Sequence, residues 1–187
     1  MLTKNASGVL ARISGKAKHH AFQSIQNQVD WEFVDSHSEP STVTGSHRRV
    51  LFICTGNYYR SRFAEAVFNH HAEERKIPWI AFSRGLAVHL AEGHLSTFTI
   101  EALKLRQIEL RHTDSGRIQL SAEDFLIADY RIALDRSEHF QMMLNQVPSW
   151  ADQIDYWDVP DIPFRSSLNA LPEIELKVMQ LLEKLSK

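Results

Sequence analysis

One stretch of this sequence, Val50 to Ala66, constrains the fold more strongly than any other. It begins with an apolar run, Val50 to Ile53, whose length and β-branched character predict a buried strand. Residues 61–76 have the apolar spacing of an amphipathic helix. A loop that joins a strand to a helix directs backbone N–H groups and the positive end of the helix dipole into one small space. We therefore expect an anion-binding loop between Cys54 and Ser61.

The side chains of this loop indicate nucleophilic chemistry on a phosphate group. Helix N-termini and nearby cations stabilise the thiolate form of a cysteine, so we expect Cys54 to be ionised near neutral pH. Arg60 offers a planar fork that matches two phosphate oxygens. Gly56 permits φ > 0 and close approach of the backbone to a ligand, whereas Asn57 tolerates the left-handed region and can tie the loop together with its amide. Ser61 is placed to donate its hydroxyl to the sulfur.

This loop resembles the phosphate loop of the low-molecular-weight protein tyrosine phosphatases. The family pattern is Cys, any residue, Gly, Asn, two residues, Arg and Ser, usually followed by Pro and soon by Ala-Glu. The resemblance starts near Arg49, and its motif residues here are Cys54, Gly56, Asn57, Arg60, Ser61, Ala64 and Glu65.

Two positions of the loop depart from the family pattern. Tyr59 stands where the family often has a second Cys, and Arg62 stands in place of the proline. We expect the first change to remove a vicinal disulfide and the second to place a positive charge beside the site. The alternative for Cys54 by itself is a small buried apolar residue.

From residue 49 onward, strand and helix patterns alternate, which is typical of a parallel α/β sheet. The resemblance implies a catalytic domain over residues 49–187, with a four-stranded parallel sheet flanked by helices on both faces. Strands are predicted at about 49–53, 79–83, 130–134 and 154–157. Helices are predicted at about 61–76, at 97–107 with Ser96 as N-cap, after Ser121 with Asp124, at 135–144, and from Pro172 onward.

The family keeps its general acid on a loop after the fourth strand, as an Asp usually followed by Pro and aromatic residues. Asp161 fits this position best, because Val-Pro-Asp is common there. In this sequence Ile162 intervenes before Pro163. Asp158 therefore remains the rival for the acid role.

Substrate contacts are expected from the loop and from aromatic residues near it. Tyr58 and Phe164 are candidates for an aromatic wall that admits an aryl phosphate more deeply than a short alkyl phosphate. Packing of Tyr58 or Tyr59 into the core is the alternative. The complete expected set of substrate-binding residues is Thr55, Gly56, Asn57, Tyr58, Tyr59, Ser61 and Phe164.

The resemblance also suggests supporting residues. Ser83 is a candidate brace for the phosphate loop, with a turn serine as the alternative. His112 is a candidate partner for the loop asparagine, with a surface histidine as the alternative. The other histidines, including His70 and His71, are expected to be exposed.

Composition excludes several classes of function. The net charge of -2 gives no reason to expect nucleic-acid binding, and no apolar stretch is long enough to span a membrane. The single cysteine excludes an internal disulfide framework and fits a reducing cytoplasm. No metal or cofactor is expected, because Arg60 and the loop amides neutralise the phosphate charge.

Residues 1–48 are predicted to be an extension, loosely ordered or with a short helix or strand, and a transit peptide is the alternative.

The sequence therefore predicts a phosphomonoester hydrolase, specifically a cysteine-dependent protein-tyrosine phosphatase that acts on a phosphotyrosine-containing protein or an aryl phosphate. An arsenate reductase of the same fold is one alternative, but with a single cysteine it requires an external thiol. A phosphate- or phosphopeptide-binding protein with little turnover is another. Phosphoarginine hydrolysis is disfavoured, because family members with that preference tend to carry a small Thr at the position of Tyr58.

Overall fold

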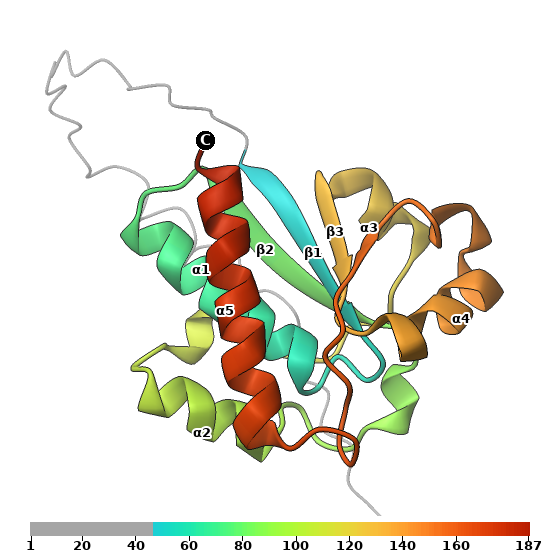
Figure 1. Cartoon of the computed structure of the whole chain (residues 1–187), viewed down its shortest axis with the longest axis horizontal. Helices are drawn as coiled ribbons and strands as arrows, with labels where there is room; N and C mark the ends of the chain where they lie inside the picture. The colour runs from blue at the N-terminus through green and yellow to red at the C-terminus, as the bar shows by residue number, and fades with distance from the viewer. Residues whose placement is uncertain (1–46) are drawn as a thin grey trace, which may run out of the picture. The chain divides into compact units, whose positions relative to one another are not determined.

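A computed structural model of the chain describes residues 47–187 (Figure 1). Its strands are β1 (Arg48–Cys54), β2 (Trp79–Gly85), β3 (Tyr130–Ala133) and β4 (Asp155–Tyr156). Its α-helices are α1 (Arg60–Glu74), α2 (Thr97–Leu105), α3 (Ala122–Ile127), α4 (Arg136–Gln146) and α5 (Ser167–Leu185). Three short 3₁₀ helices lie in the connections: η1 (Val88–Leu90), η2 (Leu110–His112) and η3 (Pro148–Trp150).

The four strands form one parallel sheet in the order β2-β1-β3-β4. In this register Val50 of β1 lies beside Ala81 of β2 and Tyr130 of β3. The chain therefore leaves the central strand β1 toward β2 on one side and reaches β3 on the other. Ligands bind parallel sheets at the carboxyl ends of the strands where such connections diverge, and Cys54 is the last residue of β1.

Helices cover both faces of the sheet, as predicted (Figure 1). Val50 and Phe52 belong to the core that α1 and α5 cover, and Ile174 of α5 packs there. Leu51 and Ile53 belong to the second core, beneath α3 and α4. All four of these strand residues are completely buried. This arrangement explains the continuous apolar run of β1, because a strand covered on both faces has no solvent-exposed side.

Most predicted element boundaries agree with the structure to within two or three residues, but the last helix begins earlier than expected. Helix α5 begins at Ser167, and Pro172 lies inside it. The buried residues Ala170, Leu171 and Ile174 already follow a helical spacing before and after the proline. Proline is common at the start of a helix, whereas here it lies in the second turn and costs the helix one backbone hydrogen bond.

Of the described histidines, His47, His89 and His94 are exposed as predicted, but the others are not. His139 is completely buried, and His112 is 6 % exposed. His70 and His71 are half-buried on α1, where the Nδ1 atom of His71 lies 3.0 Å from the Glu74 carboxylate. Histidine is amphipathic, so its presence in a polar stretch of sequence does not by itself predict exposure.

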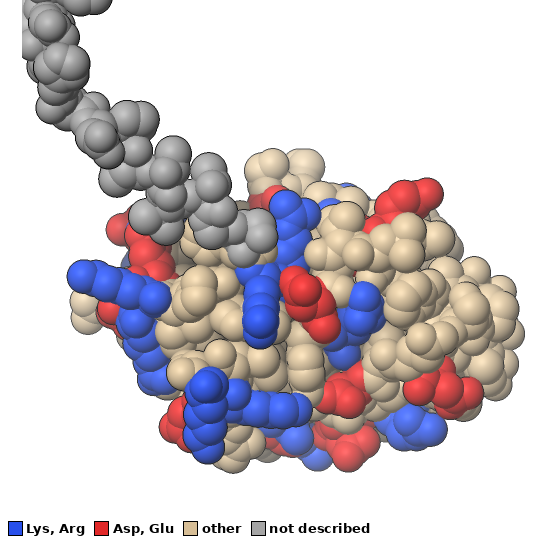
Figure 2. Space-filling model, turned by 90° about the horizontal axis from the view of Figure 1, so that it is seen from above, with Lys and Arg blue, Asp and Glu red and all other residues tan. Residues whose placement is uncertain are grey.

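Nearly all of the predicted N-terminal extension, residues 1–48, lies outside the described residues. Every helix within residues 47–187 is too short or too polar to span a membrane. On the face seen in Figure 2, basic and acidic side chains are interspersed.

Candidate phosphate-binding site

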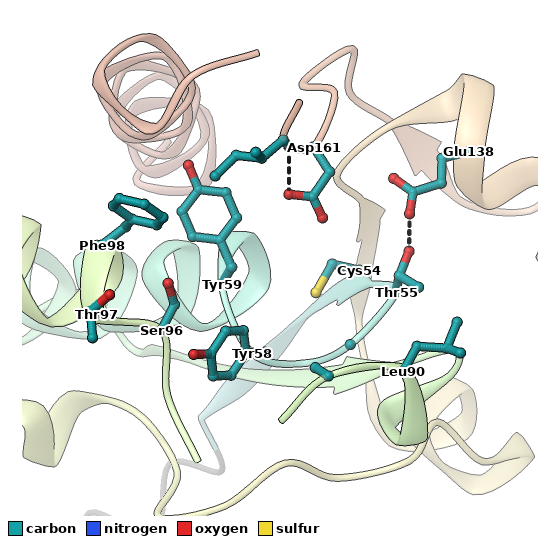
Figure 3. A pocket seen from close by; sticks show the side chains of 13 residues that line it. Cys54, Thr55, Tyr58, Tyr59, Leu90, Ser96, Thr97, Phe98, Glu138 and Asp161 are labelled. Carbon is teal, nitrogen blue, oxygen red and sulfur yellow. Dashed lines mark hydrogen bonds between the residues drawn. The ribbon is translucent and has the colours of Figure 1, made fainter. Parts of the chain in front are cut away.

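Cys54 lies at the junction of the central strand and the predicted anion-binding loop. Backbone hydrogen bonds from Leu86 N to the Cys54 carbonyl (2.9 Å) and from Ala87 N to the Thr55 carbonyl (2.8 Å) hold the start of this loop against the chain that follows β2. The sulfur of Cys54 lies 2.9 Å from the hydroxyl of Ser61 in the first turn of α1. Cys54 is only 3 % exposed, yet it borders a cavity of about 260 Å³ (Figure 3).

The buried amide of Asn57 ties the loop to two other segments. Its Nδ2 donates to the hydroxyls of Ser83 (2.8 Å) and Ser61 (3.2 Å), and its Oδ1 accepts from the backbone N–H of Ile118 (2.8 Å). Its φ of 48° lies in the left-handed region. Both predicted properties of this residue, the left-handed backbone and the bracing amide, are confirmed.

The network continues from Ser83 to a buried carboxyl group. The Ser83 hydroxyl donates to Glu65 (2.7 Å), which also accepts from the Thr113 hydroxyl (2.8 Å) and the Asp114 N–H (3.3 Å). Burial raises the pKa of Glu65 to about 7, although the hydrogen bonds from Ser83 and Thr113 act in the opposite direction. The contact expected between Ser83 and the phosphate loop is therefore present, through Asn57.

At two positions, neighbouring atoms lie so close to the backbone that only glycine fits. A Cβ on Gly85 would lie 2.7 Å from a Val88 methyl group and 2.9 Å from the backbone nitrogen of Asn57. A Cβ on Gly56 would lie 2.9 Å from that of Ala91. The positive φ that a glycine permits is not used at Gly56, because among the described glycines only Gly93 has one.

Arg60 is buried and held by two carboxylates. Its Nη2 lies 2.8 Å from Glu138 Oε2 and 2.7 Å from Asp161 Oδ2, and its Nη1 donates to the carbonyl of Val159 (3.1 Å). Its Nε is buried without a hydrogen-bond partner. Burial acts to lower the pKa of Arg60, but the negative charges of Cys54, Asp161 and Glu138 outweigh it and raise the pKa.

Glu138 is a pocket residue that the sequence reasoning missed. It lies in the first turn of α4 and borders the same cavity as Cys54 (Figure 3). The hydroxyl of Thr55 donates to its carboxylate. No local sequence signal places it there: β3 neighbours β1 in the sheet, and this brings the first turn of the helix after β3 near the phosphate loop.

Arg62 does not border the pocket, although its charge and that of Cys54 still interact. Arg62 is 1 % exposed and points away from the pocket, where it donates to the Thr113 hydroxyl (2.6 Å) and the Gly116 carbonyl (2.7 Å). Two residues along a helix correspond to a rotation of about 200°, so Arg60 and Arg62 face nearly opposite directions.

The expected contact between His112 and the loop asparagine is wrong. The Oδ1 of Asn57 accepts from Ile118 N instead, and the ring of His112 lies 3.6 Å from the carboxylate of Glu73. The surface alternative is equally wrong, since His112 is buried.

Aromatic side chains form one side of the cavity and carboxylates the other (Figure 3). Tyr58, Tyr59 and Phe98 border it, and the ring centroids of Tyr59 and Phe98 are 6.3 Å apart in an edge-on arrangement. The Tyr59 hydroxyl is buried without a partner. Burial, reinforced by the charge of Asp161, raises its pKa to about 12. Tyr59 thus packs into the core, as one of the alternatives held, and still contacts the cavity.

Phe164 does not contribute to this wall. It is 87 % exposed and borders a neighbouring groove that it shares with Asp161 and Ile162. Phe98, which was not among the expected residues, borders the cavity instead.

Of the two candidate acids, only Asp161 borders the cavity. Asp161 accepts a hydrogen bond from the N–H of Ile162 (2.8 Å) and contacts Arg60. Asp158 is exposed and lies outside the cavity lining. The geometry thus favours Asp161 for a proton donor.

Within residues 47–187, one group of three potential metal ligands occurs, His70, His71 and Glu74 on α1. None of these residues borders the cavity of Cys54. The chemistry available at the pocket is therefore that of a thiol, a guanidinium, loop amides and two carboxylates.

Comparison with known proteins agrees with this geometry. The sequence model of the family described as low molecular weight phosphotyrosine protein phosphatase matches residues 49–187. A protein-arginine-phosphatase of Bacillus subtilis (strain 168) is 29 % identical over 147 residues, which cover 74 % of this chain and 94 % of that protein.

Two solved structures share the fold. The low molecular weight protein tyrosine phosphatase from T. tengcongensis superposes with a TM-score of 0.64 at 30 % identity, over 73 % of this chain and 99 % of that one. The YwlE arginine phosphatase from Geobacillus stearothermophilus superposes with a TM-score of 0.59 at 27 % identity, over 74 % of this chain and 92 % of that one. This chain belongs to the low molecular weight phosphotyrosine protein phosphatase family.

Proposed function

We propose that this protein is a protein-tyrosine phosphatase that works through a phosphocysteine intermediate. The observation that carries the proposal is the position of the Cys54 sulfur, 2.9 Å from the Ser61 hydroxyl, in a cavity bordered by Tyr58, Tyr59 and Phe98. Loop and helix dipoles stabilise a thiolate there, and the aromatic side favours a flat aryl group beside the phosphate.

In the first step, the thiolate of Cys54 attacks phosphorus. The S–P bond forms as the P–O bond to the aryl group breaks, and Asp161 gives its proton to the departing oxygen. Arg60 exchanges its carboxylate partners for phosphoryl oxygens, and together with the loop N–H groups it stabilises the charge that spreads over the equatorial oxygens.

In the second step, water replaces the sulfur on phosphorus. Asp161, now ionised, takes a proton from the water as its oxygen attacks, and the S–P bond breaks to release phosphate. The hydroxyl of Ser61 donates to the departing sulfur and stabilises the thiolate. Dividing hydrolysis into two displacements is the gain that a covalent intermediate provides.

Phosphoarginine is a second candidate substrate. It is favoured by the relatives named as arginine phosphatases and by the two carboxylates, Glu138 and Asp161, which suit a cationic guanidinium. Tyr58 weighs against it, because its ring occupies space beside the phosphate loop.

Initial rates on three peptides of the same sequence that differ only in phosphotyrosine, phosphoarginine or phosphoserine test the proposal. We expect the highest kcat/KM for phosphotyrosine in a reducing buffer, which matches the cytoplasm that we propose as the location. The variant Cys54→Ser should lose turnover of all three peptides. A higher kcat/KM for the phosphoarginine peptide would show that phosphoarginine, not phosphotyrosine, is the preferred substrate. Arsenate reduction with an external thiol, without hydrolysis of any peptide, would overturn the phosphatase assignment.

A further inference from the structure

The carboxylate of Glu138 occupies an unusual position for an anion, because it borders a pocket built to bind phosphate. It lies 2.8 Å from the Nη2 of Arg60, and it accepts a hydrogen bond from the hydroxyl of Thr55 in the phosphate loop. Its side chain is 31 % exposed, so it faces both the loop and the cavity mouth.

The ring of a neighbouring histidine, His139, lies close to Glu138 without a hydrogen bond to it. The Nδ1 of His139 accepts a hydrogen bond from the backbone N–H of Asp135 (3.0 Å), which leaves the proton of the neutral ring on Nε2. That Nε2 lies 3.5 Å from Glu138 Oε2 and has no hydrogen-bond partner. Glu138 therefore contacts the Arg60 guanidinium and the Thr55 hydroxyl, and the neutral ring of His139 lies beside it.

Glu138 contacts the same guanidinium that phosphate binding requires. One terminal nitrogen of the guanidinium contacts both Glu138 and Asp161, at 2.8 and 2.7 Å. The mechanism requires Asp161 to carry a proton when substrate binds, which removes one of these two charges. While Glu138 is paired with Arg60 it is ionised: burial acts to raise its pKa, but the charge of Arg60 outweighs this and lowers the pKa below its ordinary value.

We propose that Glu138 is a specificity-determining residue. When the phosphoryl group binds Arg60, Glu138 loses its contact with Arg60 and pairs with a positive charge on the substrate. The preferred substrates are therefore phosphorylated side chains with Lys or Arg next to them. The inference rests on the proposed function, since it concerns which phosphoproteins the same pocket accepts.

The physical reason is a balance of charge. A bound phosphate dianion shares the site with the thiolate of Cys54, and once Arg60 turns to the phosphate, the Glu138 charge is no longer compensated. A cation on the substrate restores the balance, whereas an acidic flank adds repulsion. For charges separated by a partly solvated pocket we expect an effect of about fivefold in kcat/KM for each unit of charge.

The experiment compares two phosphotyrosine peptides that differ only in flanking Lys or Glu residues. It uses the full chain, the variant Glu138→Gln and a control, Glu123→Gln. Glutamine keeps the size of the side chain and one acceptor oxygen. Glu123 is exposed on α3 and does not border the cavity, so the control makes the same change in net charge elsewhere.

At low ionic strength we expect the native chain and Glu123→Gln to prefer the Lys-flanked peptide by about 25-fold for each Glu that Lys replaces, because that exchange changes the charge by two units. The preference should be smaller at high salt. Glu138→Gln should lose most of this preference. An acid in the first turn of a helix also stabilises that helix, but such a role would alter stability and leave the ratio between the two peptides unchanged. An unchanged ratio in Glu138→Gln would therefore overturn the proposal.

Binding of inorganic phosphate, measured by titration calorimetry, separates this inference from the proposed function because it needs no turnover. Removing the competing charge should strengthen phosphate binding about fivefold in Glu138→Gln and leave it unchanged in Glu123→Gln. Equal or weaker phosphate binding by Glu138→Gln contradicts the competition for Arg60. If Glu138→Gln binds phosphate more tightly but the native chain hydrolyses no phosphopeptide, the competition for Arg60 is supported and the proposed function is not.

Discussion

Substitution of Asn57 by alanine and by glycine separates the two structural demands on this residue. One demand is the set of three hydrogen bonds that its buried amide makes to Ser61, Ser83 and Ile118. The other is the left-handed backbone, with φ at 48°. Alanine fails both demands, whereas glycine fails only the first.

The structure sets the expected magnitudes. Each hydrogen bond lost from a buried site costs about 1 kcal/mol, so loss of all three lowers the free energy of unfolding by about 3 kcal/mol in either variant. Alanine in the left-handed region costs about 1 kcal/mol more than glycine. Asn57→Ala should therefore be less stable than Asn57→Gly, which reverses the usual order in which alanine stabilises relative to glycine.

Urea unfolding at one pH, followed by circular dichroism, measures these differences. Ser83→Ala serves as a partial control, because it removes one partner of the amide and leaves the Asn57 backbone unchanged. We expect it to lose about 2 kcal/mol, because its hydroxyl makes two hydrogen bonds, one with the Asn57 amide and one with the Glu65 carboxyl group.

Two results would refute the reasoning. If Asn57→Gly unfolds at a lower urea concentration than Asn57→Ala, the left-handed backbone does not control the choice of residue. If both variants match the native chain in stability, the amide network does not hold the loop.

The remaining predictions concern the acid and the buried carboxyl group. Asp161→Asn should lower kcat on phosphotyrosine peptides by about 100-fold or more, because proton donation to a poor leaving group is lost. Asp158→Asn should leave kcat unchanged, and the opposite pattern would transfer the acid role to Asp158. For Glu65, the folded-state pKa of about 7 exceeds the ordinary 4.5, so its contribution to stability is full below pH 4.5 and disappears as the pH rises through 7. This contribution is worth about 3 kcal/mol, and the difference between the urea unfolding free energies of the native chain and Glu65→Gln, measured from pH 5 to 8, should change by that order. A difference that stays constant with pH would contradict a raised pKa.

Much of the fold could be predicted because it depends on local patterns. The apolar run at Val50, the amphipathic spacing after Arg60 and the strands near Trp79 and Tyr130 each follow from a few neighbouring residues. The start of α5 could not be predicted in the same way, because Pro172 is compatible with either the first or the second turn of a helix.

The site was predictable where the sequence positions were close together and the residue types were restrictive. Cys54, Asn57 and Ser61 lie within one loop and one helical turn, so their contacts follow from spacing. By contrast, Glu138 and Phe98 reach the pocket from α4 and α2, and their place depends on how these helices pack against the sheet.

The sequence alone therefore determined the strand, loop and helix that bring a thiol and a guanidinium to one anion-binding position, because each of these elements forms from adjacent residues. Tertiary structure alone decided which groups surround that position. In the tertiary structure Arg62 points away from the pocket, Phe164 is exposed to solvent, and Glu138 contacts Arg60. Such contacts join residues far apart in the chain, and only the packing of the two helical layers on the sheet fixes them.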